Sequence, residues 1–196
     1  FGSFLFLGSP PTRKTDMRIA LFGDIHANLE ALNAVLEDSN AQGCTQWVCL
    51  GDIVGYNANP GECLELIRSK EYPVVKGNHD EDASGDHSLD TMNPTAATAL
   101  RWTREQLSDE QRSWLGSLRM VRQISNFTVV HSTLDDPRAW GYVTNRFDAT
   151  SNFYHQVTDV CFHGHTHVPR VFVQGDRVRE EAAELVEVEA GLKYFI

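Results

Sequence analysis

Short apolar runs that end in acidic, amide or imidazole side chains are the feature of this sequence that most constrains its fold. Three such runs are residues 19–22, 47–50 and 73–75, which lead into Gly23-Asp-Ile-His26, Gly51-Asp-Ile-Val-Gly55 and Gly77-Asn-His-Asp80. Helical patterns separate the runs, and strands that alternate with helices are typical of layered α/β folds. Ligands of such folds bind beyond the carboxyl ends of the strands. We therefore expect Asp24, Asp52 and Asn78 to gather at one edge.

Helix start and stop signals lie between the predicted strands. Apolar residues at helical spacing predict a helix at 29–36 that Gly43 closes. Asn59 followed by proline predicts the start of a second helix, with Asn as its cap. Asn93-Pro94 and the capping box Ser108-x-x-Gln111 start two more. These form a helical insertion at about residues 93–118 that carries no chemical motif.

Further strands are predicted in the second half of the chain. Residues 127–130 lead to His131, and residues 160–162 lead to Gly164-His-Thr-His167. Residues 171–173, the turn at 174–176 and the segments near 186 and 194 indicate a closing antiparallel hairpin region. The polar residues 81–92 and the segment 135–148 read as loops.

The composition predicts one globular domain with a sizeable core. The chain has 196 residues, of which 41% are hydrophobic and 22% charged. A net charge of -10 argues against a general nucleic-acid or anionic-membrane surface, because such surfaces need basic patches. A phosphate substrate stays compatible, since bound divalent metals invert the local field. The four cysteines form no close pair, which favours reduced thiols in a cytoplasmic protein.

Residues 1–16 are predicted to lie outside the domain, which we place at residues 17–196. Met17 immediately precedes the first predicted strand. The apolar run at 4–7 is too short to span a membrane, and no basic residue precedes it as in a signal peptide. We therefore expect a tag-like or disordered extension here.

Seven oxygen and nitrogen donors follow the predicted strands: Asp24, His26, Asp52, Asn78, His131, His165 and His167. This mixture suits divalent Mn, Fe, Co, Ni or Zn. Seven donors are too many for one ion, so two ions that share a bridging carboxylate fit better. Paired ions about 3.5–4 Å apart serve in-line displacement at phosphorus.

Each donor alone also has an ordinary explanation. Asp24 or Asp52 could be a helix cap, and Asn78 a turn residue. His79 and His131 could each be a hydrogen-bonded structural histidine. The metal hypothesis rests on all these residues occurring together in order. We assign no site role to the remaining three histidines, His87, His155 and His163.

In this order, the clusters that contain Asp24, Asp52, Asn78, His131 and His165 resemble the motifs of the calcineurin-like metallophosphoesterase family. One motif is weakly specific, whereas five in order are highly specific. The resemblance covers residues 17–196 and is greatest to small bacterial-type phosphodiesterases and bis-nucleoside-tetraphosphatases. It implies a four-layer αββα sandwich of two mixed β-sheets flanked by helices.

The resemblance also implies roles for the donors. Asp24, His26 and His167 would bind one ion, Asn78, His131 and His165 the other, and Asp52 would bridge them. His79 resembles the residue that stabilises the scissile phosphate or protonates the leaving oxygen. Asp80 resembles the orienting partner of that histidine. The implied mechanism is attack by a metal-bridging hydroxide whose pKa the two cations lower.

Residues near the motifs are candidate substrate contacts. Asn57 follows the Asp52 cluster, and Arg138, Trp140 and Tyr142 follow His131. The last three fit ordinary surface or core roles equally well. In relatives that resemble this chain, the strand corresponding to residues 193–196 leads into an Asn-Pro-Gly-Ser turn and further strands. We therefore expect either a truncated C-terminus or a naturally short chain.

The predicted function is hydrolysis of phosphate esters with two divalent ions, on a small phosphorylated substrate such as a nucleotide. Phosphodiesters or nucleotide phosphoanhydrides are the favoured substrates. A phosphomonoesterase, including a phosphoprotein phosphatase, is an alternative that uses the same ligands. A catalytically silent scaffold of the same fold is a second alternative, and the complete ligand set argues against it.

Overall fold

The computed structural model describes residues 5–7, 17–182 and 184–196, and in it the chain forms two mixed sheets. The smaller sheet has the order β1-β2-β3, with β1 (Leu5–Leu7), β2 (Ile19–Phe22) and β3 (Gln46–Cys49). Strand β1 runs antiparallel to β2, and β2 runs parallel to β3. Part of the predicted extension is thus a strand. Its remaining residues, 1–4 and 8–16, lie outside the described residues.

The larger sheet has six strands in the order β4-β5-β6-β9-β7-β8. Their bounds are β4 (Val121–Ile124), β5 (Phe127–Val130), β6 (Val160–Phe162), β7 (Val171–Gln174), β8 (Val178–Glu181) and β9 (Lys193–Phe195). The β5/β6 and β6/β9 pairs are parallel, and the other pairs are antiparallel. The predicted closing hairpin is β7–β8, while the segment near Val186 forms no strand.

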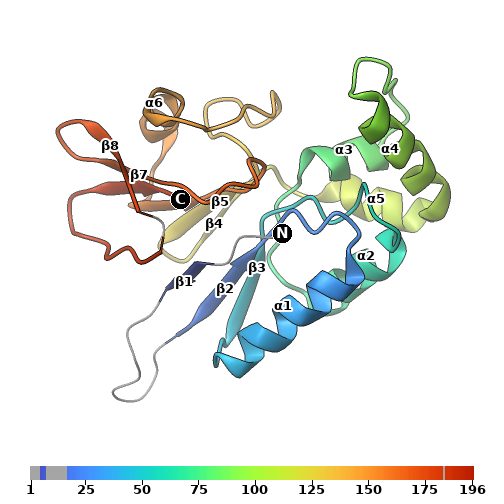
Figure 1. Ribbon diagram of the computed structural model, residues 1–196, viewed down its shortest axis with the longest axis horizontal. Coiled ribbons are helices and arrows are strands. Elements are labelled where there is room, and N and C mark those ends of the chain that lie inside the picture. The colour runs from blue at the N-terminus through green and yellow to red at the C-terminus, as the bar shows by residue number, and fades with distance from the viewer. Residues whose placement is uncertain (1–4, 8–16, 183) are drawn as a thin grey trace.

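The described residues form six helices. These are α1 (Leu29–Ala41), α2 (Pro60–Ser69), α3 (Asn78–Ser84), α4 (Pro94–Gln106), α5 (Asp109–Ser117) and α6 (Arg146–His155). Figure 1 shows α1 to α5 gathered beside the smaller sheet and α6 beside the larger sheet. The layers follow one another as helices, smaller sheet, larger sheet and helix, so the two outer layers are helical, as predicted.

Alternating side chains of the strands fill three separate cores. In β2, Leu21 packs between the two sheets while its neighbour Phe22 packs against the helices beside the smaller sheet. In β7, Val171 and Val173 face the inter-sheet core, and Phe172 faces α6 together with Phe153. Because side chains alternate with a period of two, strands that lie between two cores, such as β2 and β7, are apolar on both faces. The four-layer sandwich is confirmed.

Three local predictions were wrong. Residues 73–75 form no strand, because Val74 and Val75 each make only an isolated bridge. Helix α3 continues to Ser84, into the segment predicted as the loop 81–92. Helix α6 begins at Arg146, inside the segment predicted as the loop 135–148. The four cysteines are buried and free, as expected for reduced thiols.

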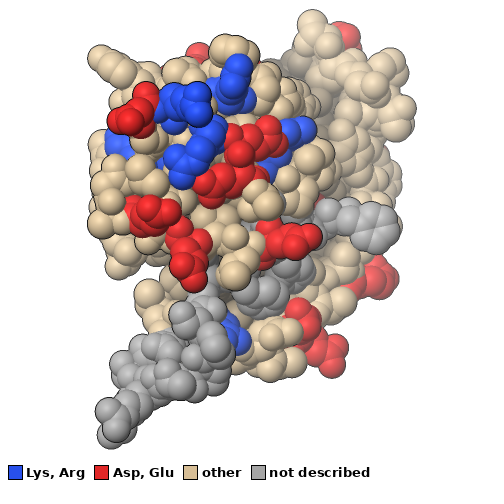
Figure 2. All heavy atoms as spheres, turned by 60° about the vertical axis from the view of Figure 1, so that its left-hand side comes forward, with Lys and Arg blue, Asp and Glu red and all other residues tan. Residues whose placement is uncertain are grey.

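Charged side chains are mixed on the surface. On the face seen in Figure 2, Lys and Arg lie among Asp and Glu and form no uniformly basic surface. Among the described residues, no helix is long and apolar enough to cross a bilayer.

Candidate metal centre

The loops that follow the strands of both sheets meet at one site. The backbone N–H groups of Asp24 and His26 donate to the carbonyls of Gly51 and Asp52, both at 2.9 Å, which joins the first two motif loops. The Asp24 carboxylate accepts from the backbone N–H of His165 at 3.1 Å, although the two residues are 141 positions apart. This contact joins the smaller sheet to the larger one.

Five of the seven predicted donors have left-handed backbones. Their φ angles are 53° for Asp24, 48° for His26, 51° for Asp52, 67° for His165 and 55° for His167. Such angles are uncommon for non-glycine residues and store strain that clusters at functional sites. These donors therefore converge from tight turns.

The first group of donors contains Asp24, His26 and His167, whose ligand atoms lie within 4.8 Å of one another. Nε2 of His167 is 3.1 Å from Oδ1 of Asp24 and 3.2 Å from Nε2 of His26. Two imidazole nitrogens and a carboxylate oxygen that converge in this way are a donor set suited to a divalent transition metal.

The second group contains Asp52, His131 and His165, again within 4.8 Å. Nε2 of His131 is 3.4 Å from Oδ2 of Asp52 and 3.3 Å from Oδ1 of Asn78. The structure thus brings all seven predicted donors together in two adjoining groups. It also gives a third combination, in which His26 and Asp52 lie with His79.

Asp52 lies between the two groups. Its Oδ2 is 3.6 Å from Nε2 of His26 and 3.4 Å from Nε2 of His131. Its Oδ1 accepts the backbone N–H of His79, in the first turn of α3, at 2.9 Å. One oxygen therefore caps a helix, and the other faces imidazoles of both groups.

Backbone carbonyls orient the imidazole rings. Nδ1 of His131 lies 2.7 Å from the Leu50 carbonyl, and Nδ1 of His26 lies 3.3 Å from that of Val54. A ring nitrogen beside a carbonyl carries the proton that it donates, so in the neutral form of both rings Nε2 keeps the lone pair. His165 has the opposite orientation. Its Nε2–H donates a hydrogen bond to the Trp140 carbonyl at 2.9 Å, which leaves the lone pair of Nδ1 free to bind a metal ion.

The buried carboxylates and histidines shift one another's pKa. Burial raises the pKa of Asp52, but His131 and the other nearby imidazoles outweigh it and hold the pKa well below its usual range. Burial opposes a charge on His131, yet Asp52 raises the pKa of His131 to about 9. Burial lowers the pKa of His26 and of His165. Buried carboxylates need a compensating cation, and the donors fit divalent ions that would supply it.

The structure corrects the role predicted for Asp80. Both of its carboxylate oxygens accept backbone N–H groups, from Asp52 at 2.9 Å, Ile53 at 2.9 Å and Gly77 at 3.0 Å. No hydrogen bond joins Asp80 to the His79 ring in the described chain. Asp80 is therefore a positioning residue that holds the Asp52 loop against the start of α3.

His79 lies in the site with one nitrogen turned away. A Cβ at Gly55 would be 2.5 Å from Nδ1 of His79, and this buried Nδ1 has no hydrogen-bond partner among the described residues. Burial lowers the pKa of His79 to about 4, so the ring is neutral at neutral pH. The ring also lies edge-on to His26, with the centroids 4.8 Å apart.

A cavity of about 440 Å³ opens over the donors. Its lining contains predicted donors and His79. The other lining residues are neutral and are not predicted donors: Tyr56, Met92, Asn93, Ala96, Tyr142 and Thr166. Tyr142 is a predicted contact. Sequence reasoning missed Tyr56, although it follows the Asp52 motif closely, and it assigned no site role to the predicted helix start at Asn93-Pro94.

The other three predicted contacts do not line the cavity. Asn57 donates its side-chain amide to the His26 carbonyl at 2.8 Å. The exposed Arg138 lies 3.7 Å from the Glu81 carboxylate. Trp140 places its ring edge-on to His131 at 6.0 Å, and its carbonyl orients His165. Asn57 and Trp140 therefore contact the donor residues without lining the cavity, whereas Arg138 pairs with Glu81.

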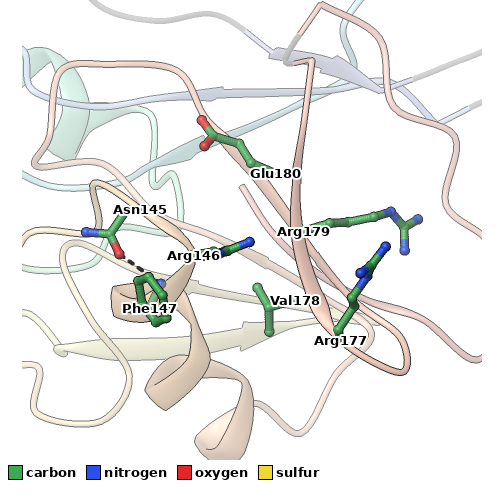
Figure 3. Close-up of a pocket in the computed structure, with 7 residues that line it drawn as sticks. All are labelled: Asn145, Arg146, Phe147, Arg177, Val178, Arg179 and Glu180. Atoms are coloured by element: carbon green, nitrogen blue, oxygen red, sulfur yellow. Dashed lines mark hydrogen bonds between the residues drawn. The ribbon is translucent and has the colours of Figure 1, made fainter.

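A further cavity of about 500 Å³ lies between the start of α6 and β8, and it contains none of the predicted donors. Arg146, Arg177 and Arg179 line it. In the view of Figure 3, the side chains of Arg177 and Arg179 end near each other and apart from the end of Arg146, so the three guanidinium groups do not meet at one point. Arg179 is also paired with Glu181 at 2.8 Å. We assign no role to this cavity.

A family model for the calcineurin-like phosphoesterase superfamily domain matches residues 17–187. The chain belongs to this superfamily. A curated relative, an uncharacterized protein of Methanocaldococcus jannaschii, is 42% identical over 158 residues, which cover 78% of this chain and 63% of the relative. The chain thus spans less than two thirds of that relative's length.

Two solved structures are similar to this superfamily member. A metallophosphoesterase from Sphaerobacter thermophilus is 39% identical, with a TM-score of 0.78 over 92% of this chain and 75% of that one. A hypothetical protein from Pyrococcus horikoshii is 20% identical, with a TM-score of 0.68 over 78% of this chain and 71% of that one. The second likeness concerns the fold alone. The predicted family and fold are confirmed.

Proposed function

We propose that this protein is a phosphodiesterase, or a hydrolase of nucleotide phosphoanhydrides, that binds two divalent ions with Asp52 common to both. The position of Asp52 carries the proposal, because its Oδ2 is within 3.6 Å of one histidine from each donor group. Asp24, His26 and His167 would complete one ion site, and Asn78, His131 and His165 the other. Superfamily membership supports the same chemistry.

When bound, a pair of divalent ions supplies an activated water and neutralises charge on the phosphoryl group. The chain's own residues prepare this. The carbonyls of Leu50 and Val54 fix the tautomers of His131 and His26. His79, neutral and next to His26, would donate from Nε2 to the phosphoryl or leaving oxygen. The free, buried cysteines support a cytoplasmic location.

The test is a metal-reconstituted assay that compares bis-para-nitrophenyl phosphate with para-nitrophenyl phosphate. We expect that Mn stimulates hydrolysis and that the diester is hydrolysed faster than the monoester. Asp52→Asn should lose the hydrolysis of both compounds. A preference for the monoester would indicate a phosphomonoesterase instead. Absence of turnover with every divalent metal would indicate a silent scaffold, and full activity in Asp52→Asn would exclude the bridging role.

His79→Ala separates catalysis from metal binding. The variant should keep both ions and lose turnover by about 10²–10⁴-fold, the usual contribution of general acid–base groups. Metal content is measured by mass spectrometry of the dialysed protein. Loss of an ion in His79→Ala would instead make His79 a ligand, as its grouping with His26 and Asp52 allows.

A further inference from the structure

The cavity over the donors has no cationic wall. None of the described residues that line it is Lys or Arg, and the nearby Arg138 points its charge at Glu81. Its wall beyond the donors is formed by Tyr56 and Tyr142 with Met92 and Ala96 of the α4 start. All positive charge available to a substrate would therefore come from the ion site.

The two tyrosines flank the donors from the two sheets. The Tyr142 ring stacks on His165, with the centroids 4.3 Å apart and an interplanar angle of 24°. The Tyr56 ring lies 4.5 Å from His79 and 4.8 Å from His26. Tyr56 is 48% exposed and Tyr142 is 61% exposed, so each ring presents surface to a ligand. The phenols are close enough for Tyr142 to contribute to a raised pKa of Tyr56, after burial and Asp52.

From this geometry we infer that Tyr56 and Tyr142 select esters that carry one phosphoryl group and a planar aromatic group, such as the ring of an aryl ester or the base of a nucleoside. The inference rests on the proposed function and narrows it, because it favours aryl or nucleoside phosphates over polyphosphates. The phosphoryl group would lie at the donors, and the aromatic group would lie against the tyrosines.

Electrostatics explains the rejection of polyphosphates. Each additional phosphoryl group brings negative charge into the cavity, where it needs a guanidinium, an ammonium or a further cation. The described lining supplies none beyond the donor groups. An aromatic ring, by contrast, gains by stacking on exposed tyrosine rings and by covering the half-buried Met92.

A binding experiment with two phosphonates that cannot be hydrolysed tests the aromatic part. Phenylphosphonate and methylphosphonate differ only in the ring, and calorimetry with Mn-loaded protein measures both dissociation constants. We expect about tenfold tighter binding of phenylphosphonate, the size of one aromatic stacking interaction. Tyr142→Ala and Tyr56→Ala should remove most of this preference, while Tyr142→Phe should retain it.

Two controls separate this effect from loss of structure. Tyr154→Ala removes a tyrosine that is 88% exposed on α6, and it should leave both dissociation constants unchanged. Metal content is measured for each variant, because Tyr142 contacts the His165 ring. An equal affinity for the two phosphonates in the parent protein, or a preference that survives in both alanine variants, would overturn the inference.

The rejection of polyphosphates is tested by rate. Bis-para-nitrophenyl phosphate should be hydrolysed at least about tenfold faster than diadenosine tetraphosphate, and Met92→Lys should narrow that ratio by adding a cation to the wall. Faster hydrolysis of the tetraphosphate by the parent would overturn the inference and leave the proposed function intact. A phenylphosphonate preference without turnover of either ester would overturn the proposed function alone.

Discussion

Asp52 uses its two oxygens for different purposes. Oδ1 accepts the backbone N–H of His79 at 2.9 Å, and Oδ2 faces His26 and His131. The helix-cap and metal-ligand interpretations of this residue are therefore compatible. The first turn of α3 fixes the carboxylate, which in turn fixes where a shared ion would bind. A carboxylate held in this way needs no reorganisation when a cation arrives.

Asp80→Asn tests the positioning role of the neighbouring carboxylate. The change replaces one acceptor oxygen with an NH₂ group that faces a backbone N–H of the Asp52 loop. We expect a loss of about 1–3 kcal/mol in the free energy of unfolding and a weaker affinity for metal. Urea denaturation and metal titration measure the two effects.

Asp86→Asn is the matched control for that variant, because Asp86 is exposed and pairs with Arg112 on the surface. It should change neither quantity appreciably. If Asp80→Asn kept its stability and its metal affinity but altered only the pH profile of turnover, the original assignment of Asp80 as the orienting partner of His79 would be restored.

The predicted donors are residues that the structure brings together, whereas the residues that support them were not predicted. Most of the donors follow a strand in a short motif, and Asn78 follows two isolated bridges. The family resemblance paired Asp80 with His79, but adjacent helical residues do not face each other. Two of the three partners of Asp80 lie in a loop 27 and 28 positions away, so spacing gives no sign of them. Tyr56 was missed because no pattern distinguishes an aromatic cavity wall from a surface ring.

At the scale of elements, the start of α3 requires a glycine at position 77, because there is no room for a Cβ atom. A Cβ at Gly77 would be 2.0 Å from Oδ1 of Asp52. Gly77→Ala should therefore displace Asp52, cost about 1–3 kcal/mol of unfolding free energy as an overpacked core site does, and weaken metal binding. Chemical denaturation and metal titration check the result.

Gly61→Ala in α2 is the comparison variant. Its Cβ would meet only the Gln111 side chain, at 3.6 Å, and its φ angle is not in the left-handed region. Because alanine favours helix, stability should stay the same or rise by up to about 1 kcal/mol. Equal metal affinities for Gly77→Ala and Gly61→Ala would contradict the steric argument.

Two helices begin with Asn-Pro, but only one has a side-chain cap. The Asn93 side chain accepts the backbone N–H of Thr95 at 2.9 Å, whereas Asn59 makes no such bond at the start of α2. Asn93→Ala should cost about 1 kcal/mol of unfolding free energy, and Asn59→Ala clearly less. Thermal denaturation of both variants measures the difference, and equal losses would contradict the capping role of the Asn93 side chain.

The elements that were missed lack an apolar stripe. Helix α3 buries a single apolar side chain, Ala83, along with two polar ones, so it has no helical periodicity. Helix α6 buries Asn152 between Ala149 and Phe153, and the Asn152 amide oxygen accepts the Leu134 N–H at 2.6 Å. Helix prediction depends on apolar residues at helical spacing, and a buried polar residue interrupts that spacing.

At the scale of the molecule, the centre requires both sheets. Asp24 and Asp52 come from loops of the smaller sheet, whereas His131 and His165 follow strands of the larger one. The inter-sheet core that contains Leu21 therefore supports the site as well as the fold. The order of motifs indicated this arrangement only through the family resemblance, since no local pattern states which sheet a strand joins.

Charge compensation at this shared site makes the stability of the metal-free protein depend on pH. Burial opposes protonation of His131, but Asp52 raises its pKa from the ordinary 6.5 to about 9. A raised folded-state pKa stabilises the fold fully below 6.5, and this stabilisation is lost as the pH rises toward 9. His167, whose hydrogen bond to Asp24 raises its pKa, acts with the same sign. His26, His79 and His165 have lowered pKa values and are neutral in the folded protein here, so their opposite contribution ends once the unfolded histidines have lost their protons above pH 6.5.

We therefore expect the melting temperature of the protein in chelator to fall between pH 6.5 and 9. The metal-saturated protein is the control, because a His131 that binds metal through Nε2 carries no titrating proton there and its melting temperature should vary much less. Calorimetry in both states, at several pH values across this window, gives the comparison. A metal-free melting temperature that stays level or rises would show that His131 does not hold the compensating proton, and that the carboxylates are balanced in another way.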